Sequence, residues 1–209
     1  MTKIKICGIT TLEDALLVAE LGAWAVGFIF VKSSPRYVEP EKAAEIIEAL
    51  PENIEKIGVF VNPTIDEIQS IIHKVKLTKI QLHGNESKEF CTTLKNSTGL
   101  SIIKAIRVKE FDDLKIIQNY KETAVAILLD SYSPQEFGGT GKSFNWEIAV
   151  EAKKYGIPII LAGGVNQDNI KEAYSKLKPY AIDISSGVEL KKGIKDHKKL
   201  KDLFNEANK

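Results

Sequence analysis

Cysteine is scarce in this chain, and its scarcity excludes two kinds of protein. The 209 residues include two cysteines, Cys7 and Cys91. Two cysteines provide neither a disulfide framework nor a cysteine-rich metal cluster, so we expect no bound metal. Free thiols persist in a reducing compartment, and we therefore expect a cytoplasmic protein.

Long apolar runs and an excess of one charge are absent as well. The longest apolar stretch, AWAVGFIFV, has nine residues, which is too short to cross a bilayer. Lys3 and Lys5 interrupt the apolar core that an N-terminal signal peptide would need. A net charge of +1 creates no strong field for nucleic acid or an anionic membrane. We expect neither a nucleic-acid nor a membrane partner.

The sequence instead alternates short apolar runs with amphipathic helical windows. The predicted strands are nearly continuous in apolar residues, as is typical of parallel strands covered on both faces. They span 3–7, 25–30, 56–61, 79–83, 102–108, 125–130, 158–162 and 181–186. The helical windows are 10–23, 39–51, 63–75, 86–96, 110–120, 145–155, 166–176 and 196–207.

The predicted strands end at a nearly constant spacing. From Cys7 to Ser185 the successive intervals are 23, 31, 22, 24, 23, 32 and 23 residues, so one strand–helix unit takes about 25 residues. Eight such units favour a closed (β/α)8 TIM barrel, an α/β fold, over an open doubly wound sheet. We expect residues 1–209 to form a single barrel domain.

Local capping signals predict where several helices begin. Thr10 with Glu13, and Thr64 with Glu67, match the capping-box pattern, in which the two side chains satisfy backbone N–H groups of the first turn. Asn145 and Asn166 are the predicted N-caps of two later helices.

Two of the intervals are longer because extended segments follow the second and sixth strands. These segments are residues 31–40 and the glycine-bearing residues 131–144. Strand-to-helix loops of a (β/α)8 barrel form the face that carries active sites. The GGTGK stretch at 138–142 fails the P-loop pattern, because Glu136 stands where the first glycine is required. We interpret this stretch as part of a mobile loop.

Glycines follow the seventh and eighth strands, in LAGGVN and DISSGVE. Glycine lets backbone N–H groups approach an anion closely, and the loops at these two places form the usual phosphate site of the barrel. One such loop is equally well explained as a turn, but two at the expected places favour phosphate binding. The residues concerned are Gly163, Gly164, Ser185, Ser186 and Gly187.

Two residues at strand ends are candidates for acid–base chemistry. Cys7 is either a small core residue or a thiol at the rim, whose thiolate fraction a nearby cation would increase. Asp130 ends the apolar run AILL and is either an acid or base in a pocket or a turn residue.

Three further polar side chains fall on the same predicted rim. Arg36, in the loop motif SPR, either binds a carboxylate through its guanidinium group or is solvated. His83 ends the fourth strand, as a site residue or a structural one. Asp183 lies within the eighth strand, where its charge must be satisfied by hydrogen bonds near the rim.

Seven motifs, in their order along the chain, resemble those of the phosphoribosylanthranilate isomerases. They are KICGIT, GFIF with SPRYV, GVFVN, QLHG, LLDS with GGTGKSFNW, LAGGV and DISSGVE, and they run from Lys3 to Glu189. The resemblance implies an isomerase of tryptophan biosynthesis that needs no cofactor and no metal. Its reaction would be the Amadori rearrangement of N-(5-phosphoribosyl)anthranilate to 1-(2-carboxyphenylamino)-1-deoxyribulose 5-phosphate.

The resemblance also implies a role for each candidate residue. Cys7 would be the general base, Asp130 the general acid, and Arg36 the ligand of the anthranilate end. His83 and Asp183 would line or support the site, and the two glycine loops would bind the phosphate. The partner would be a small phosphosugar substrate. Apart from the resemblance, we expect a monomer or a homodimer, and we hypothesise that residues 131–143 close over the sugar and exclude water.

Two other interpretations stay open. A related phosphosugar isomerase on the same barrel, of the histidine pathway or bifunctional, would use two aspartates, and Cys7 counts against it. A non-catalytic barrel that binds a phosphate ligand would be expected to lose Cys7 or Asp130, and both are present.

Overall fold

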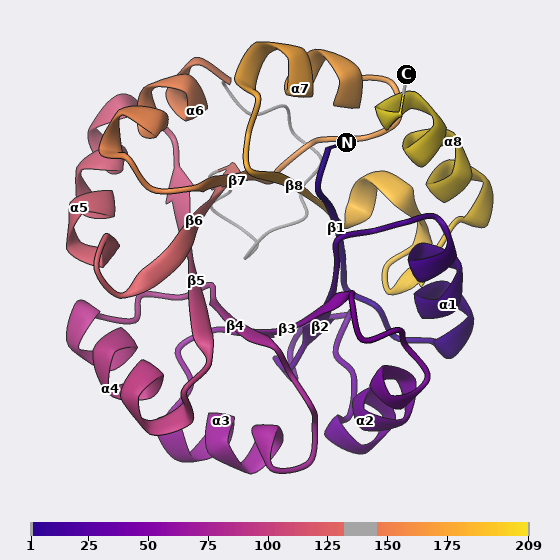
Figure 1. Cartoon of the computed structure of the whole chain (residues 1–209), viewed down its shortest axis with the longest axis horizontal. Coiled ribbons are helices and arrows are strands. Elements are labelled where there is room, and N and C mark those ends of the chain that lie inside the picture. Colours follow the sequence, from indigo (N-terminus) through magenta and orange to yellow (C-terminus); the bar gives the residue numbers. More distant parts are fainter. Residues whose placement is uncertain (1, 132–145, 209) are drawn as a thin grey trace.

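Eight parallel strands, paired in chain order from β1 to β8, close into a barrel in the computed structural model, which describes residues 2–131 and 146–208. Helices form an outer ring around them (Figure 1). The strands are β1 Ile4–Cys7, β2 Ala25–Ile29, β3 Glu55–Phe60, β4 Lys79–Leu82, β5 Ser101–Val108, β6 Ala124–Ser131, β7 Ile159–Leu161 and β8 Ala181–Ile184. The predicted (β/α)8 fold is confirmed.

The outer ring consists of helices that follow the strands along the chain. They are α1 Leu12–Glu20, α2 Pro40–Glu48, α3 Ile65–Ile72, α4 Lys88–Thr98, α5 Ile117–Tyr120, α6 Trp146–Ala152, α7 Ile170–Leu177 and α8 His197–Ala207. The 3-10 turns are η1 Phe111–Ile116, η2 Lys153–Tyr155 and η3 Ser186–Val188. A small antiparallel pair, β9 Glu189–Lys191 and β10 Ile194–Lys195, follows η3.

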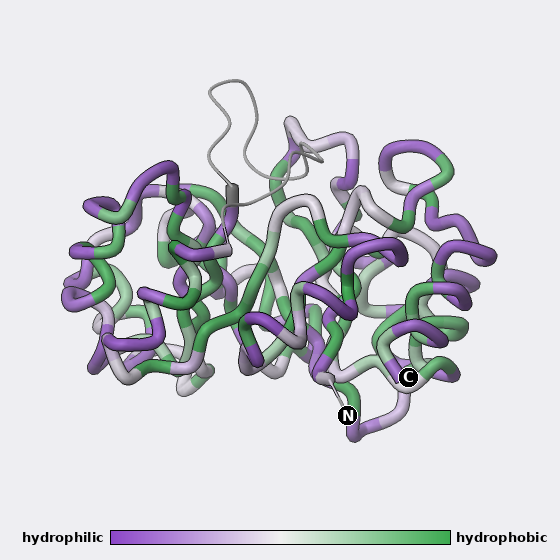
Figure 2. The backbone as a smooth tube through the Cα atoms, turned by 90° about the horizontal axis from the view of Figure 1, so that it is seen from above, coloured by the Kyte–Doolittle hydropathy of each residue, from purple (hydrophilic) through white to green (hydrophobic). Residues whose placement is uncertain are grey.

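The barrel has two buried apolar layers because side chains of a strand alternate between its two faces. One layer lies inside the barrel and is built from small and branched residues: Ala25, Ile57, Ile103, Ala105, Ala126, Leu128, Ile160, Ala162 and Ala181. The larger layer lies between the strands and the helices and includes the apolar stripes of α2 and α8. Figure 2 shows the hydrophobic stretches of the tube concentrated in the central strands, with hydrophilic stretches frequent along the helices.

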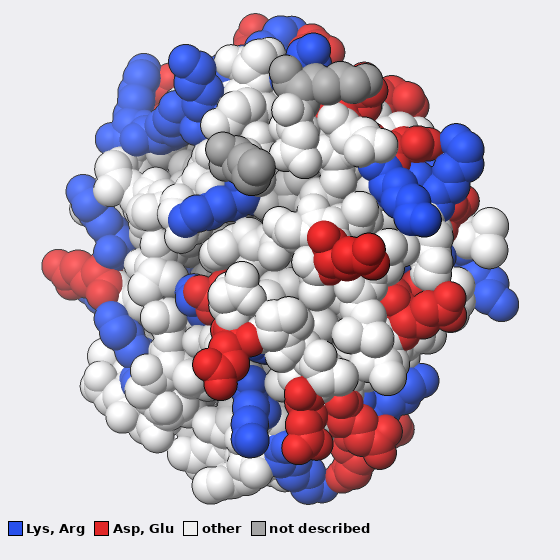
Figure 3. Space-filling model, turned by 45° about the vertical axis from the view of Figure 1, so that its right-hand side comes forward, with Lys and Arg blue, Asp and Glu red and all other residues white. Residues whose placement is uncertain are grey.

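Charges of both signs are interspersed on the face drawn in Figure 3. Among the helices within the described ranges, none is long and apolar enough to span a bilayer.

The helix starts test the predicted caps. Thr64 and Glu67 form the predicted capping box of α3. The predicted Thr10–Glu13 box is wrong: Thr11 is the N-cap of α1 and accepts from the backbone N–H of Asp14, while the hydroxyl of Thr10 donates to the carbonyl of Gly193. Because the Thr10 hydroxyl binds a residue far away in the chain, the next threonine, Thr11, caps the helix instead.

The seventh helix also begins later than predicted. Asn169, not Asn166, is its N-cap, and Asn166 instead accepts from the N–H of Asp168 in the turn that precedes the helix. The other predicted asparagine cap, Asn145, lies outside the described residues.

Candidate active site

A cavity of about 490 Å³ opens at the C-terminal ends of the strands. This volume suits a small organic ligand. All ten site residues predicted from the sequence line it: Cys7, Arg36, His83, Asp130, Gly163, Gly164, Asp183, Ser185, Ser186 and Gly187. The prediction that these residues share one rim is confirmed, and their individual roles remain predictions.

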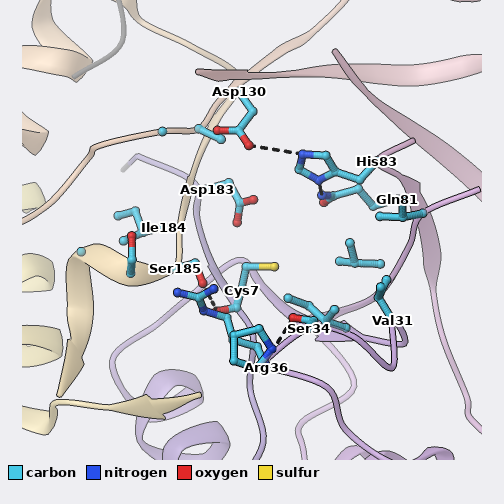
Figure 4. Close-up of a pocket in the computed structure, with 18 of the residues that line it drawn as sticks. Cys7, Val31, Ser34, Arg36, Gln81, His83, Asp130, Asp183, Ile184 and Ser185 are labelled. Atoms are coloured by element: carbon cyan, nitrogen blue, oxygen red, sulfur yellow. Dashed lines mark hydrogen bonds and ion pairs between the residues drawn. The ribbon is translucent and has the colours of Figure 1, made fainter. Parts of the chain in front are cut away.

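Strand periodicity explains why four of these side chains meet. Asp130 and Asp183 stand two residues after Leu128 and Ala181 of the interior layer, so their side chains point into the barrel. Cys7, at the end of β1, and His83, directly after β4, line the same cavity. Because all eight strands are parallel, their C-terminal ends lie at one mouth. Figure 4 shows Cys7 facing the cavity from one side and Asp130 with His83 from the other.

Asp130 is one end of a short polar chain across two strands. Oδ2 of Asp130 lies 3.3 Å from Nε2 of His83, and Nδ1 of His83 lies 3.1 Å from Nε2 of Gln81 (Figure 4). If the Gln81 amide donates to Nδ1, the proton of a neutral imidazole is on Nε2, facing the carboxyl group. Among the described residues, the side-chain carbonyl oxygen of Gln81 and Nε2 of His83 are buried without a hydrogen-bond partner, so the contact of His83 with Asp130 is a close approach of an imidazole to a carboxyl group; both Gln81 and His83 line the cavity.

The Cys7 thiol is 5% exposed, and its surroundings act on its ionisation in opposite directions. Burial raises the pKa of Cys7 above its ordinary value, and the charge of Asp183 acts in the same direction. The ammonium groups of Lys5 and Lys195 act against this rise. The expectation that a nearby cation would favour the thiolate is thus met by two lysines, but burial outweighs them.

Arg36 is held by a carboxylate of the protein. Its Nε and Nη2 donate to the two oxygens of Glu189, both at 2.8 Å, in a bidentate pair. Oε1 of Glu189 also accepts from Nζ of Lys195 at 3.2 Å. Burial raises the pKa of Glu189, but these two cations outweigh burial and hold it below its usual range. Arg36 therefore reaches the cavity in a fixed orientation.

The two glycine loops touch each other at the mouth of the barrel. Gly163 and Gly164 have φ values of 87° and 71°, in the region that glycine tolerates best. A β-carbon on Gly187 would lie 2.2 Å from the carbonyl oxygen of Val165, so only glycine lets these loops approach so closely. The side-chain amide of Asn169 donates to the carbonyl of Gly164 at 2.9 Å and fixes the first loop.

The sequence reasoning missed four charged or polar residues around the site. Lys5 and Gln81 carried a usable signal, because each stands two residues before a predicted site residue on the same strand and so shares its face. Glu189 and Lys195 carried no such signal, since each reaches the site from the β9–β10 segment after the barrel is complete.

The second cysteine and the loop after β6 lie apart from these residues. Cys91 lies buried in α4, and burial raises its pKa to about 11. The predicted loop of residues 131–143, with its GGTGK stretch, falls largely outside the described residues. Within the described ranges, no group of three or more His, Cys, Asp or Glu side chains is placed to hold a metal ion.

Together, a closed (β/α)8 barrel and a mouth lined by a thiol, a carboxyl–imidazole pair and two glycine loops define a barrel enzyme with acid–base groups. Residues 4–206 match the family model described as N-(5'phosphoribosyl)anthranilate (PRA) isomerase. The chain therefore belongs to the N-(5'-phosphoribosyl)anthranilate isomerase family.

Relatives of known name agree with this membership over nearly the whole chain. The N-(5'-phosphoribosyl)anthranilate isomerase of Geotalea uraniireducens is 48% identical over 207 residues, covering 99% of this chain and 98% of the relative. The solved phosphoribosyl anthranilate isomerase of Thermotoga maritima is 39% identical, with a TM-score of 0.92 over 100% of this chain and 99% of that one.

Two further solved structures carry information on ligand and assembly. One is a phosphoribosyl anthranilate isomerase in complex with reduced 1-(o-carboxyphenylamino)-1-deoxyribulose 5-phosphate, 38% identical with a TM-score of 0.89. The other shows monomers generated from the dimeric Thermotoga maritima enzyme, 38% identical with a TM-score of 0.88. Each match covers 100% of this chain and 99% of the other.

Proposed function

We propose that this chain converts N-(5'-phosphoribosyl)anthranilate to 1-(2-carboxyphenylamino)-1-deoxyribulose 5-phosphate in tryptophan biosynthesis, with Cys7 as general base and Asp130 as general acid. Family membership supports the reaction. The observation that carries the assignment of roles is geometric: the thiol and the Asp130–His83 pair face one cavity from opposite sides (Figure 4).

Ring opening is the first step and requires an acid. Asp130 donates its proton to the ring oxygen of the ribose, and the bond between C1 and that oxygen breaks with its electron pair on the oxygen. The nitrogen lone pair then forms an iminium bond to C1. The imidazole of His83, 3.3 Å from Asp130, orients the carboxyl group for this transfer.

Proton removal from C2 is the second step and requires a base. The iminium group acidifies the C2 hydrogen, and the Cys7 thiolate takes it as a proton. The electron pair of the C–H bond becomes a C1–C2 double bond while the iminium electrons return to nitrogen. The resulting enolamine tautomerises to the 2-ketose. General acid and general base each contribute about 10²–10⁴-fold to such a rate.

Anchors at the two ends of the substrate fix its reacting carbons between these groups. The loops with Gly163, Gly164 and Ser185 to Gly187 bind the phosphate, and Arg36 binds the carboxylate of the anthranilate. Support comes from the contact between the two glycine loops and from the bidentate hold of Glu189 on Arg36. Asp183 supports the site through Lys5.

The partner of the site is a small phosphosugar, consistent with the product analogue in the relative's complex. For the assembly, the dimeric state named for a Thermotoga maritima relative supports the homodimer among the two expected states. A reducing cytoplasm suits an enzyme that depends on a free thiol.

The test combines genetic rescue with enzyme assays. The wild-type gene should rescue a tryptophan auxotroph that lacks this isomerase, and Cys7→Ser and Asp130→Asn should each lower kcat by about 10²–10⁴-fold with an unchanged circular dichroism spectrum. The matched control is Cys91→Ala, which removes the other thiol, buried in α4, and should retain activity. Near-normal turnover of either site variant removes that residue from the mechanism.

A further inference from the structure

Lys5 is a fully buried lysine that takes part in neither ring opening nor proton removal from C2. It lies on β1, its side chain is 0% exposed, and its Nζ lies 2.9 Å from Oδ1 of Asp183 on β8. Lys5 and Asp183 are register partners on adjacent strands. Burying a cation is costly unless it is paired, and this pair stands inside the barrel directly below its mouth.

The ammonium group shares a small space with the catalytic thiol. Lys5 and Cys7 are two residues apart on one strand, so both side chains point into the barrel. Cys7 is paired with Gly27 of β2. The position that a β-carbon of Gly27 would occupy is 2.8 Å from Sγ of Cys7 and 3.1 Å from Nζ of Lys5. The absence of a side chain at Gly27 thus creates the space that the thiol and ammonium occupy together.

The charges around this space leave Lys5 protonated. Burial alone lowers the pKa of Lys5, but Asp183 and Cys7 outweigh it and raise that pKa. The groups that act on Cys7 come from three elements: Lys5 of β1, Asp183 of β8 and Lys195 of β10. Lys195 also binds the main-chain carbonyl of Cys7 and the carboxylate of Glu189. Among the described hydrogen bonds, Lys5 does not bind the main chain of Cys7. Its ammonium group instead lies near the side-chain sulfur of Cys7.

We propose that Lys5 is a positioning residue for the reaction: anchored by Asp183, its ammonium group holds the Cys7 sulfur in the space beside Gly27 and stabilises its thiolate form. The inference rests on the proposed function, in which that thiolate takes the proton from C2. Asp183 contributes to this role because its carboxylate keeps Lys5 charged and directs the ammonium group towards Cys7.

The test follows the ionisation of the thiol directly and through catalysis. In a Cys91→Ala background, Cys7 is titrated by the ultraviolet absorbance of its thiolate and by the pH dependence of its alkylation with iodoacetamide. Lys5→Met should raise the midpoint by about 1–3 units, the shift typical of losing an opposite charge at close range. The limb of kcat/KM that rises with pH should move to higher pH by the same amount. Lys5→Arg keeps the positive charge and should bring the thiol midpoint most of the way back.

Two controls separate this role from a structural one. Lys104→Met removes another buried lysine, paired with Glu86 at 2.9 Å on the outer side of β5, and should leave the Cys7 midpoint in place. Where Lys5→Met fails to fold, the double variant Lys5→Met/Asp183→Asn removes both charges and is compared with Asp183→Asn alone.

The outcomes are distinct. A folded Lys5→Met protein with an unchanged thiol midpoint overturns the inference, whatever its activity. A shifted thiol midpoint together with a shifted rate limb supports it. A shifted thiol midpoint with an unmoved rate limb shows that Lys5 acts on the thiol but that Cys7 is not the base; this outcome overturns the role of Lys5 in the reaction and the role proposed for Cys7, and leaves the reaction itself in place.

Discussion

Nζ of Lys195 lies 2.6 Å from the main-chain carbonyl oxygen of Cys7, although 188 residues separate them in the chain. The same ammonium group lies 3.2 Å from the carbonyl of Ser185 and 3.2 Å from Oε1 of Glu189. One side chain of the β9–β10 segment therefore connects the end of β1, the loop after β8 and, through Glu189, Arg36. The rim of the cavity is thus held in place by residues of a segment that follows the barrel.

Lys195→Met should lower both stability and turnover. Removing three hydrogen bonds from one donor, two of them buried and one partly buried, while Glu189 keeps its pair with Arg36, should reduce the free energy of unfolding by about 1–3 kcal/mol, measured by urea denaturation. The matched control, Lys198→Met, removes an exposed lysine paired with Asp202 on α8 and should change stability by less than about 0.5 kcal/mol. Equal effects of the two substitutions would contradict the connecting role.

Arg36→Ala should act mainly on substrate binding. Charge-assisted hydrogen bonds contribute about 1.5–3 kcal/mol, so we expect KM to rise by about tenfold or more, with a smaller change in kcat. Arg36→Lys keeps the charge without the planar fork and should give an intermediate KM. Steady-state kinetics measure both constants, and an unchanged KM in Arg36→Ala argues against the carboxylate role.

Gly187→Ala should separate the two glycine loops, because its β-carbon would lie 2.2 Å from the carbonyl of Val165. We expect a raised KM for substrate and weaker inhibition by inorganic phosphate. Gly99→Ala is the control. This glycine has a φ of 69°, and a β-carbon there would meet no other described atom within 4 Å. The substitution should cost about 1–2 kcal/mol of stability and leave phosphate inhibition unchanged. Wild-type phosphate inhibition in Gly187→Ala would exclude these loops as the anion site.

The ion pairs of Glu189 should make the free energy of unfolding depend on pH. Its pKa is lowered in the folded protein because Arg36 and Lys195 outweigh burial. Its contribution is therefore fully present above the unfolded pKa of about 4.3 and is lost as the pH falls through the lower folded value. The stability difference between wild type and Glu189→Gln, from urea midpoints, should shrink in that window. Glu41→Gln, at an exposed pair with Lys74, should show almost no difference at any pH.

Much of the site was predictable because strand geometry is regular. Once Cys7, His83 and Asp130 were assigned to the ends of parallel strands, barrel closure required them to share one mouth, and the cavity contains all three. The same alternation would have placed Lys5 and Gln81 on that face. The start of α1 was predicted one residue early, because the hydroxyl of Thr10 is engaged by Gly193 and Thr11 takes over the cap.

By itself, the sequence determined the eightfold strand–helix repeat and the residues at the strand ends, because apolar periodicity and spacing are properties of neighbouring residues. The family followed separately, from the resemblance of seven motifs. Only the tertiary structure decided which charges surround the thiol and which carboxylate holds Arg36. Closure of the barrel brings β1 beside β8, and the chain then returns with Glu189 and Lys195. Contacts across such distances depend on packing in three dimensions, which no local pattern encodes.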